Sequence, residues 1–421
     1  MLPPTMIAMS TGDTAWLLVS AALVMLMTPG LALFYGGMVQ SKNVLSTFMH
    51  SFFSLGLVTV QFVVIGYTLC FGTSFHGIVG GLDFLGLDGV SMAPAGDANP
   101  AASASVPHLA FMIYQCMFAV IAPALISGAY AERFKFSAYA LFTLGWATLV
   151  YDPIAHWSWA ADGWLMKLGA IDFAGGTVVH LSSGISALVV ALVLGKRKGY
   201  PSTRFPPHDL TMTVLGAGLL WFGWFGFNAG AASLSDGRAA LAMVNTQLGA
   251  AAGALSWCLV EGARIKKPTM LGLASGLVAG LVAITPAAGF VSPLAALAIG
   301  AAGGGICYGA VLLKARLCYD DALDAFGVHG VGGATGALLT GLFARGIFNN
   351  GTGGGLHLLG KQAIAIGAAA AWSAVVTFVL LKLIDLAVGL RVDQETEHDG
   401  LDGSLHGESA YGGPGSVAHT G

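Results

Sequence analysis

Long apolar runs separated by short polar segments follow one another along almost the whole chain. A membrane-spanning helix needs about 20 predominantly apolar residues, and the chain contains eleven runs of about this length. A loop at 73–107 is predicted to be irregular, and the chain after residue 388 is polar. The predicted spans are residues 14–38, 46–72, 108–131, 137–155, 174–195, 211–230, 240–260, 269–286, 293–313, 326–344 and 364–388.

The composition indicates that these runs lie in a lipid bilayer. Hydrophobic residues make up 56% of the 421 residues and charged residues only 9%, whereas an ordinary soluble domain has about 25% charged residues. So few charges cannot cover a water-exposed surface, which excludes a soluble enzyme, a nucleic-acid-binding protein and a disordered scaffold. Glycines such as Gly332, Gly333 and Gly336 let membrane helices approach closely. The sequence therefore predicts an all-α polytopic membrane protein with eleven transmembrane helices in a compact bundle.

The positions of the basic residues predict the orientation of the chain. Asp13 is the only charge ahead of the first span, and the first basic residue is Lys42, so a signal peptide with a basic n-region is not expected. Basic residues favour the cytoplasmic side of a membrane. If the N-terminus lies outside the cell, fourteen basic residues lie on the cytoplasmic side and four on the outer side. The cytoplasmic set is Lys42, Arg133, Lys135, Lys196, Arg197, Lys198, Arg204, Arg264, Lys266, Lys267, Lys314, Arg316, Lys382 and Arg391, and the outer set is Lys167, Arg238, Arg345 and Lys361.

The protein is expected to lie in the inner (plasma) membrane. The odd number of spans then places its C-terminus in the cytoplasm. Residues 1–388 form the predicted transmembrane domain, and residues 389–421 form a cytoplasmic tail. This tail is acidic, because Arg391 is accompanied by six Asp and Glu residues: Asp393, Glu395, Glu397, Asp399, Asp402 and Glu408.

Two segments of the chain echo each other around a histidine. Each has the pattern His-x3-Gly-x2-small residue, and each follows an acidic residue that lies close to a Phe. The two echoes are Asp172-Phe173 with His180, Gly184 and Ala187, and Asp324-Ala325-Phe326 with His329, Gly333 and Gly336. Five spans separate them, an odd offset that predicts two inverted repeats, about 14–195 and about 211–344, with 364–388 as an extra helix. Chance similarity in a Gly- and Ala-rich sequence is the alternative.

Three ionisable residues lie in or beside predicted spans, where such groups usually have a function. His180 and His329 can line a narrow path as a pair of neutral rings, each with one donor and one acceptor, or they can be hydrogen-bonded packing residues. Two histidines without a third ligand make a poor zinc site, so no metal or cofactor is predicted. Asp172 either caps the helix that follows it or provides a negative charge near the outer mouth, or both. It lies eight residues, about 12 Å of helix, before His180, so no direct contact between them is expected.

Five aromatic residues are predicted to lie near a similar outer depth: Tyr114, Phe118, Trp159, Trp224 and Phe227. Aromatic belts at the membrane interface are ordinary anchors. Aromatic faces can also form a cage around a cation. The sequence leaves both interpretations open.

Several Gly- and aromatic-rich motifs occur in order along the chain: residues 29–37 (PGLALFYGG), 131–133 (AER), 172–180 (DFAGGTVVH), 223–230 (GWFGFNAG), 324–333 (DAFGVHGVGG) and 389–392 (GLRV). On these motifs the chain resembles the ammonium transporter/methylammonium permease family, which is related to the Rhesus proteins, over about residues 12–411. DFAGGTVVH followed by FGVHG is specific to this family. The resemblance implies a homotrimer of eleven-span subunits, each with its own pore for ammonium or ammonia and, more weakly, methylammonium.

The resemblance also implies roles for individual residues. Phe118 and Trp159 would recruit ammonium at the outer face with Tyr114 nearby, and Phe118 would stack on Phe227 as a gate. His180 and His329 would be the pore pair, and Asp172 would support recruitment or deprotonation. Trp224 and Ala231 are motif neighbours, and Ala231 stands where bacterial members commonly have a Ser that contacts the cation. Weaker binding at the mouth is therefore expected unless a displaced hydroxyl or a water compensates.

The tail resembles the regulatory tail of this family, which packs on the cytoplasmic face where a P-II signalling protein docks. Basic loops (Lys196, Arg197 and Lys198; Arg264, Lys266 and Lys267) are expected to attract the acidic tail and an acidic partner.

Other classes of membrane protein fit the sequence less well. A sodium-coupled transporter would need more buried carboxylates than this sequence offers. A membrane enzyme would need a nucleophile or a metal cluster, and an ammonium sensor would need an appended signalling domain. A Rhesus-type channel for neutral gases is the nearest alternative, and Phe118, Phe227 and Trp159 favour the ammonium branch.

Overall fold

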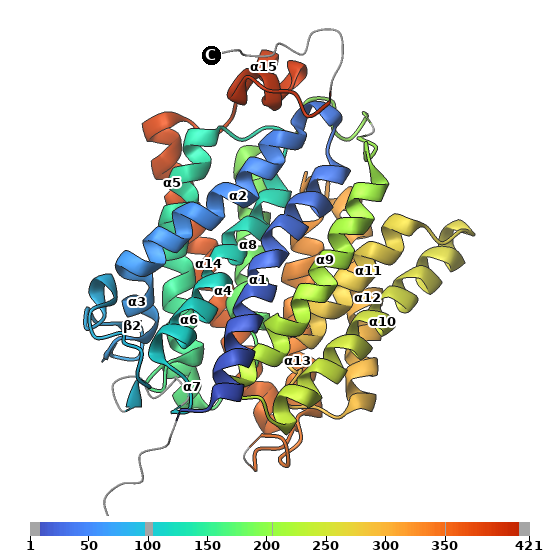
Figure 1. The fold of residues 1–421 in the computed structure, drawn as a ribbon. Coiled ribbons are helices and arrows are strands. Elements are labelled where there is room, and N and C mark those ends of the chain that lie inside the picture. The colour runs from blue at the N-terminus through green and yellow to red at the C-terminus, as the bar shows by residue number, and fades with distance from the viewer. Residues whose placement is uncertain (1–8, 97–103, 204, 350, 412–421) are drawn as a thin grey trace, which may run out of the picture.

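Long helices running side by side make up most of the computed structural model, which describes residues 9–96, 104–203, 205–349 and 351–411 (Figure 1). Within these ranges, eight helical segments are long and apolar enough to cross a membrane. They are α1 (Thr11–Met38), η1 (Ser41–Asn43) with α2 (Val44–Gln61), η2 (Phe62–Gly66) and α3 (Tyr67–Phe71), α4 (His108–Tyr130), η6 (Gly176–Leu181) with α8 (Ser182–Leu194), α9 (Leu210–Ala229) with η7 (Gly230–Ala232), α12 (Pro293–Leu317), η8 (Phe326–Gly330) with α13 (Val331–Phe343), and α14 (Leu356–Val388).

Three further helical segments occupy the remaining predicted spans. They are α5 (Phe136–Trp146) with η5 (Ala147–Tyr151) and α6 (Asp152–Trp159), α10 (Gly237–Ile265) and α11 (Met270–Ile284). A helix therefore lies in each of the eleven predicted windows. Most ends differ from the prediction by a few residues, as at 137–155, where the helical segment runs from Phe136 to Trp159. The largest difference is at α14, which begins at Leu356, eight residues before the predicted start at 364.

The predicted loop at 73–107 contains more regular structure than expected. Strands β1 (Ser74–Phe75) and β2 (Val79–Gly80) form an antiparallel hairpin, in which Ser74 pairs with Gly80 and Phe75 with Val79. The short helices η3 (Leu85–Leu87) and α7 (Trp164–Leu168) lie in this loop and in the one after α6. The Trp157 indole donates a hydrogen bond to the Ile78 carbonyl (2.7 Å), which attaches the hairpin to α6. The part of this loop at 97–103 lies outside the described residues.

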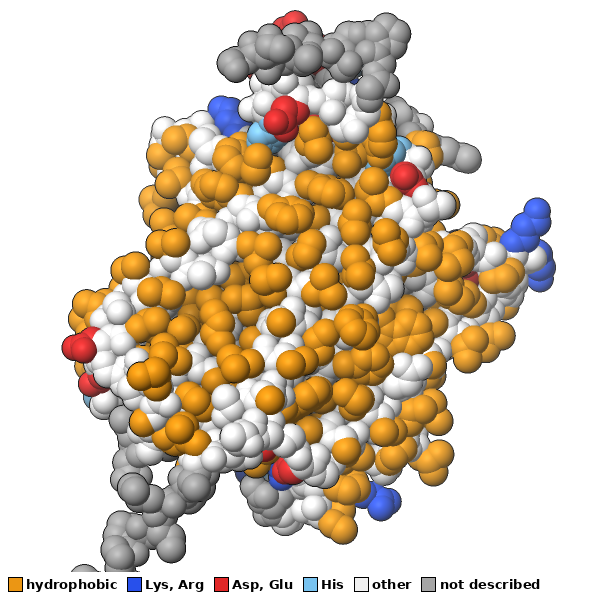
Figure 2. Space-filling view, viewed as in Figure 1, with side chains coloured by type: hydrophobic (Ala, Val, Ile, Leu, Met, Phe, Trp, Pro, Cys, Tyr) orange, Lys and Arg blue, Asp and Glu red, His pale blue; other side chains and the backbone are white. Residues whose placement is uncertain are grey.

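The surface of the bundle is apolar where a soluble protein would be polar. Hydrophobic side chains cover the middle of the face shown in Figure 2, and the charged side chains visible there lie toward its edges. Leu215, Leu259 and Val375 are 58%, 72% and 62% exposed. An apolar surface of this extent is typical of contact with lipid or with other subunits, in agreement with the predicted membrane protein.

Glycines bring the two histidine-bearing segments together. A Cβ added at Gly333 on α13 would lie only 2.6 Å from the Gly176 carbonyl oxygen on η6, and one added at Gly184 on α8 would collide with the Gly330 backbone of η8. Side chains at these positions would push the helices apart. The close approach predicted for Gly333 is thus confirmed, and it sets the spacing between η6 and η8.

The tail folds back on one end of the bundle, which we term the tail end, and α15 (Gln394–Asp399) lies there at the top of Figure 1. The Lys135 amide donates to the Leu390 carbonyl (2.9 Å) and the Val392 amide to the Arg133 carbonyl (3.2 Å). In η9 (Asp402–His406), the Asp402 carboxylate accepts hydrogen bonds from the amides of Leu45 and Ser46. Residues 389–411 are therefore packed on the bundle, while 412–421 lie outside the described residues.

Candidate functional site

His180 on η6 and His329 on η8 face each other inside the bundle. Their Nδ1 atoms are 3.3 Å apart, the ring centroids are 5.3 Å apart with planes 17° from parallel, and both side chains are buried. A hydrogen bond between two Nδ1 atoms requires one ring to donate and the other to accept. Within the described chain, Nε2 of His180 has no hydrogen-bond partner. The structure thus brings the two predicted histidines into a pair with a free ring nitrogen.

A carboxylate anchors the start of η6. Oδ1 of Asp172 accepts hydrogen bonds from the amides of Gly175 and Gly176, and Oδ2 accepts from Thr177 and Val178, over 2.7–3.1 Å. Helices leave their first amides without partners, and Asp172 satisfies four of them. The predicted capping role is confirmed. Its carbonyl also accepts the Trp159 indole N–H (2.9 Å), so Asp172 links the helix start to Trp159.

A second carboxylate, which the sequence analysis missed, anchors the start of η8. The Asp321 carboxylate accepts hydrogen bonds from the Ala325 amide (3.1 Å) and the Phe326 amide (2.8 Å). We matched Asp324 with Asp172, but Asp324 forms an ion pair with Lys314 instead. The informative signal was the spacing, because Asp172 and Asp321 each precede their histidine by eight residues.

A narrow cavity of about 10 Å³ adjoins the histidine pair. This volume is at the lower limit for a single water molecule. Apart from the two histidines, the walls are apolar: Met27, Leu31, Phe34, Ile121, Leu125, Leu220, Trp224, Phe227 and Val278. The Trp224 ring stacks on His180 with centroids 5.3 Å apart, and its indole N–H donates to the Thr285 hydroxyl (2.9 Å). Trp224 therefore forms a wall of this cavity.

Two phenylalanine rings close the cavity toward the aromatic pocket described next. Phe118 and Phe227 are stacked, with centroids 4.2 Å apart and planes 28° from parallel, and both are almost completely buried. Phe227 also lies 5.8 Å from the His180 ring. Phe227 lines the cavity beside the histidines and Phe118 lines the aromatic pocket, so the stacked pair lies between the two.

The aromatic pocket has a volume of about 110 Å³ and lies on the other side of Phe118. Its lining residues are Phe111, Tyr114, Gln115, Phe118, Trp159, Phe173, Ala174, Ala231 and Ser233. The Phe118 ring is perpendicular to Trp159 (centroids 5.9 Å apart) and 4.9 Å from Tyr114. Three of the five predicted aromatic residues, Tyr114, Phe118 and Trp159, thus line one pocket, whereas Trp224 and Phe227 do not. Asp172 does not line this pocket.

The sequence analysis also missed two polar residues of the aromatic pocket. Gln115 precedes Phe118 by three residues on α4, so both lie on the same face of that helix. Ser233 follows Ala231 by two residues, just after η7. The helical spacing could have identified Gln115, whereas the position of Ser233 depends on the turn after η7.

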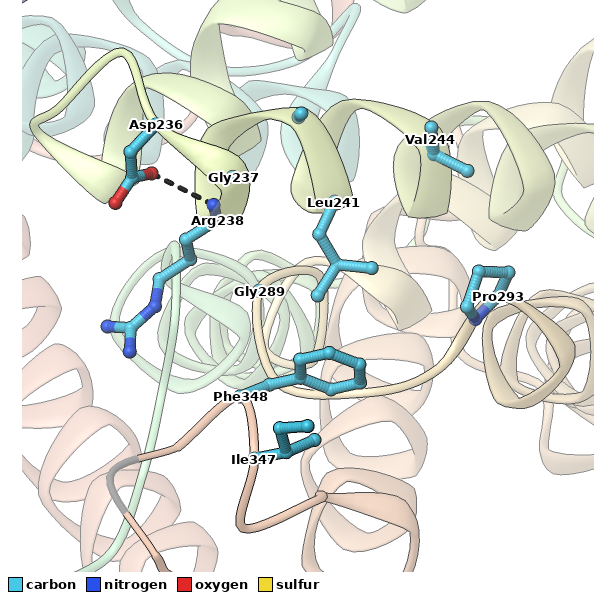
Figure 3. A pocket seen from close by; sticks show the side chains of 10 residues that line it. Asp236, Gly237, Arg238, Leu241, Val244, Gly289, Pro293, Ile347 and Phe348 are labelled. Atoms are coloured by element: carbon cyan, nitrogen blue, oxygen red, sulfur yellow. Dashed lines mark hydrogen bonds between the residues drawn. The ribbon is translucent and has the colours of Figure 1, made fainter.

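A larger hollow of about 660 Å³ lies at the start of α10 (Figure 3). Asp236 and Arg238 stand at one side, where the Asp236 carboxylate accepts the Arg238 backbone amide (2.9 Å), and Leu241, Ile347 and Phe348 provide apolar walls. None of the predicted site residues lines this hollow.

Ion pairs hold the loop after α8 at the tail end. Arg197 pairs with Glu132 (2.7 Å) and Asp320 (2.8 Å). Burial alone would raise the pKa of Asp320, but hydrogen bonds and charge from Arg197 outweigh it and hold that pKa below its ordinary value. The buried Arg197 side chain is thus already paired and does not hold the tail.

The tail is held mainly through backbone groups. Glu397 pairs with Arg391 (2.7 Å) and accepts the Lys198 amide (2.7 Å), and Arg391 donates to the Lys196 carbonyl (2.7 Å). The expected docking on Arg264, Lys266 and Lys267 is not observed among the described residues. Arg264 lies in the last turn of α10, and Lys266 and Lys267 follow it in the loop between α10 and α11, which projects from the side of the bundle in Figure 1.

Comparisons with known proteins identify relatives of the whole chain. Residues 15–411 match the family model described as Ammonium Transporter Family. An ammonium transporter of Bacillus subtilis is 53% identical over 409 residues, covering 96% of this chain and 99% of that protein. The ammonium transporter Amt1 of Archaeoglobus fulgidus is 44% identical, covering 96% of this chain and 100% of that protein.

Solved structures give the same result for the fold. The crystal structure of Saccharomyces cerevisiae Mep2 superposes with a TM-score of 0.86 at 38% identity, covering 92% of this chain and 88% of that chain. A structure described as a sensor Amt protein gives a TM-score of 0.86 at 31% identity, covering 94% of this chain and 98% of that chain.

Proposed function

This chain belongs to the ammonium transporter family, and we propose that it recruits ammonium at the aromatic pocket, removes a proton and conducts ammonia past His180 and His329. Membership of the family supports ammonium transport as the activity and argues against an enzyme. The observation that carries the mechanism is the continuous column of rings from Trp159 through Phe118 and Phe227 to the histidine pair.

The proposed architecture has eleven crossings in two inverted five-helix halves, with α14 outside both. Helices in all eleven predicted windows support it. Further support comes from the two histidine segments, since each begins with a carboxylate that caps a helix eight residues before the histidine. An N-terminus outside and a tail in the cytoplasm remain the orientation we propose, from the distribution of basic residues.

Recruitment rests on the attraction between a cation and aromatic faces. Trp159, Tyr114 and Phe118 surround a pocket large enough for ammonium and open to solvent on one side. A cation held near such faces gains about 0.5–2 kcal/mol, depending on how far it is desolvated. Asp172 contributes by holding Trp159 in place and by adding negative charge behind the pocket.

Selectivity follows from the cavity beyond the Phe pair. Ammonium and potassium are of nearly equal size, so a pore cannot separate them by radius. An ion in the apolar cavity would lose its water without replacement, at a cost of several kcal/mol. Ammonium can leave its proton behind and cross as ammonia, with ring nitrogens as hydrogen-bond partners, whereas potassium has no proton to lose. The histidine pair thus accounts for both passage and selectivity.

The proposal is tested with the purified protein in liposomes under an inward gradient of ammonium, methylammonium or potassium. We expect saturable uptake of ammonium, weaker uptake of methylammonium and no potassium flux above protein-free liposomes. Equal potassium and ammonium flux would refute the proposal. Voltage recording in the same assay distinguishes transport that carries net charge from transport of ammonia alone.

We further propose that the subunits assemble as a homotrimer and that the tail regulates transport with a P-II protein as partner. The exposed apolar side chains of α9, α10 and α12 supply surface for subunit contacts. The docked tail supports regulation, because Asp402 joins it to the start of α2 and Glu397 joins it to the loop after α8. Disturbing the tail would therefore act on α8, which ends at that loop and continues from η6, the segment that carries His180.

A further inference from the structure

The aromatic pocket offers an ammonium ion few hydrogen-bond acceptors. Most of its lining is aromatic or Ala. The Tyr114 hydroxyl is already engaged, since it donates to the Phe227 carbonyl (2.7 Å). Ammonium has four N–H donors, and aromatic faces compensate them only in part. Gln115 and Ser233 are the other polar side chains that line the pocket, and each has an oxygen that accepts hydrogen bonds.

The backbone holds Ser233 in an uncommon conformation beside the pocket. Ser233 follows η7 with φ of 57° and ψ of 3°, in the left-handed region, and its amide donates to the Gly230 carbonyl (2.8 Å). This region costs a residue other than Gly about 1–2 kcal/mol, so the turn is maintained by its surroundings. The turn ends η7 and leads the chain toward α10, with the Ser233 side chain at the pocket.

Both side chains have hydrogen-bonding capacity to spare. Within the part of the chain that the structure describes, neither the Ser233 hydroxyl nor the Gln115 amide forms a side-chain hydrogen bond, and both residues are partly exposed. Ala231, which lies in η7 and lines the pocket, has no polar side-chain group. An ammonium ion in the pocket would therefore meet these two unengaged oxygens on a mainly aromatic wall.

We infer that Ser233 is a substrate-binding residue of this pocket, whose hydroxyl accepts an N–H of ammonium with help from the Gln115 carbonyl. This inference rests on the proposed function and specifies the polar half of its recruitment site. Ala231 was expected to weaken ammonium binding because it has no hydroxyl. On this inference the Ser233 hydroxyl, two residues later, accepts the hydrogen bond from ammonium instead.

The test removes the hydroxyl without straining the turn. Gly tolerates the left-handed conformation better than any other residue, so Ser233→Gly is expected to fold. Ala232→Gly serves as the matched control, because it adds a similar backbone freedom at the adjacent residue and removes no polar group. A third variant, Ser233→Gly/Ala231→Ser, restores a hydroxyl to the pocket wall from another position.

The readout is the half-saturation and maximal rate of ammonium uptake into liposomes by the full-length protein. A hydrogen bond to a charged group corresponds to about a tenfold change in affinity or more. We therefore expect Ser233→Gly to raise the half-saturation about tenfold with little change in the maximal rate. Ala232→Gly should match the wild type, and the double variant should recover most of the lost affinity.

Two outcomes would overturn the inference: a half-saturation for Ser233→Gly within twofold of the wild type, or an equal increase for Ala232→Gly. The same assay separates this failure from failure of the proposed function. If the wild-type protein shows no saturable ammonium uptake, the proposed function is wrong. If the wild type transports ammonium and the Ser233 variant is unaffected, only the binding role of Ser233 is wrong.

Discussion

Replacing Asp172 with Asn removes one carboxylate oxygen from the start of η6 and tests how this helix is anchored. Each oxygen of Asp172 accepts two backbone amides. Whichever oxygen becomes the NH2 group, two amides lose their acceptor and face another donor. An unsatisfied buried donor costs about 1–3 kcal/mol, so Asp172→Asn should destabilise the protein by about 2–6 kcal/mol.

Asp321 provides the matched comparison for this substitution. Each of its oxygens accepts one backbone amide, so Asp321→Asn leaves only one donor unsatisfied and should cost about 1–3 kcal/mol. Both substitutions remove one negative charge at a helix start. The charges of Lys314 and Asp324 act on Asp321 in opposite directions, so the main remaining difference is the number of lost hydrogen bonds. The expected order of stability is therefore wild type, then Asp321→Asn, then Asp172→Asn.

Thermal unfolding of the three proteins in one detergent measures this order, and liposome uptake measures the consequence. Asp172→Asn should also impair ammonium uptake, because the Trp159 indole bonds to the carbonyl of residue 172 and η6 carries His180. An Asp172→Asn protein as stable as the wild type, or less destabilised than Asp321→Asn, would refute the account of the helix start.

Three further predictions follow from other parts of the structure. Gly333→Ala should lower stability by about 1–3 kcal/mol, because the new Cβ would meet the Gly176 carbonyl at 2.6 Å; unchanged thermal unfolding would contradict this. Deleting the chain from Gly389 onward should impair uptake and weaken P-II binding without preventing membrane insertion, and normal uptake with normal P-II-dependent inhibition would show that the tail only solubilises the end. The pKa of Asp320 is lowered in the folded protein, so its ion pair with Arg197 stabilises the fold fully above the ordinary Asp pKa of about 3.9. This stabilisation is lost only as the pH falls through the lowered pKa. A hydrogen-exchange protection factor at the Arg197 amide that already dropped between about pH 7 and pH 5 would contradict this.

The sequence was most informative where function depends on composition and on regular spacing. The helix windows follow from the length of the apolar runs, because a span needs about 20 residues whatever its neighbours are. The two histidines could be predicted as a pair because ionisable groups are rare in spans and because the same pattern surrounds both. Their mutual distance of 3.3 Å is a property of helix packing that the sequence does not state.

Features that depend on tertiary packing were missed. The β1–β2 hairpin is too short for an alternating pattern, and Asp321 was overlooked in favour of Asp324, which lies closer to the Phe of its motif. Ser233 lies at the aromatic pocket because a left-handed residue ends η7, and serine does not predict that conformation. The basic loop at Arg264 was expected to hold the tail from its charge alone, whereas backbone groups near Lys198 hold it.

The central claim, that the histidine pair makes the pore selective for ammonium, is tested most directly by flux through the double variant His180→Ala/His329→Ala. Ammonium and potassium uptake are measured in the same liposomes, with His357→Ala as a control because His357 is exposed at the start of α14. The account predicts that the double variant elutes as an assembled protein of wild-type size but loses selective ammonium uptake, whereas His357→Ala behaves as the wild type. Ammonium uptake by the double variant at the wild-type rate, with potassium still excluded, would contradict it.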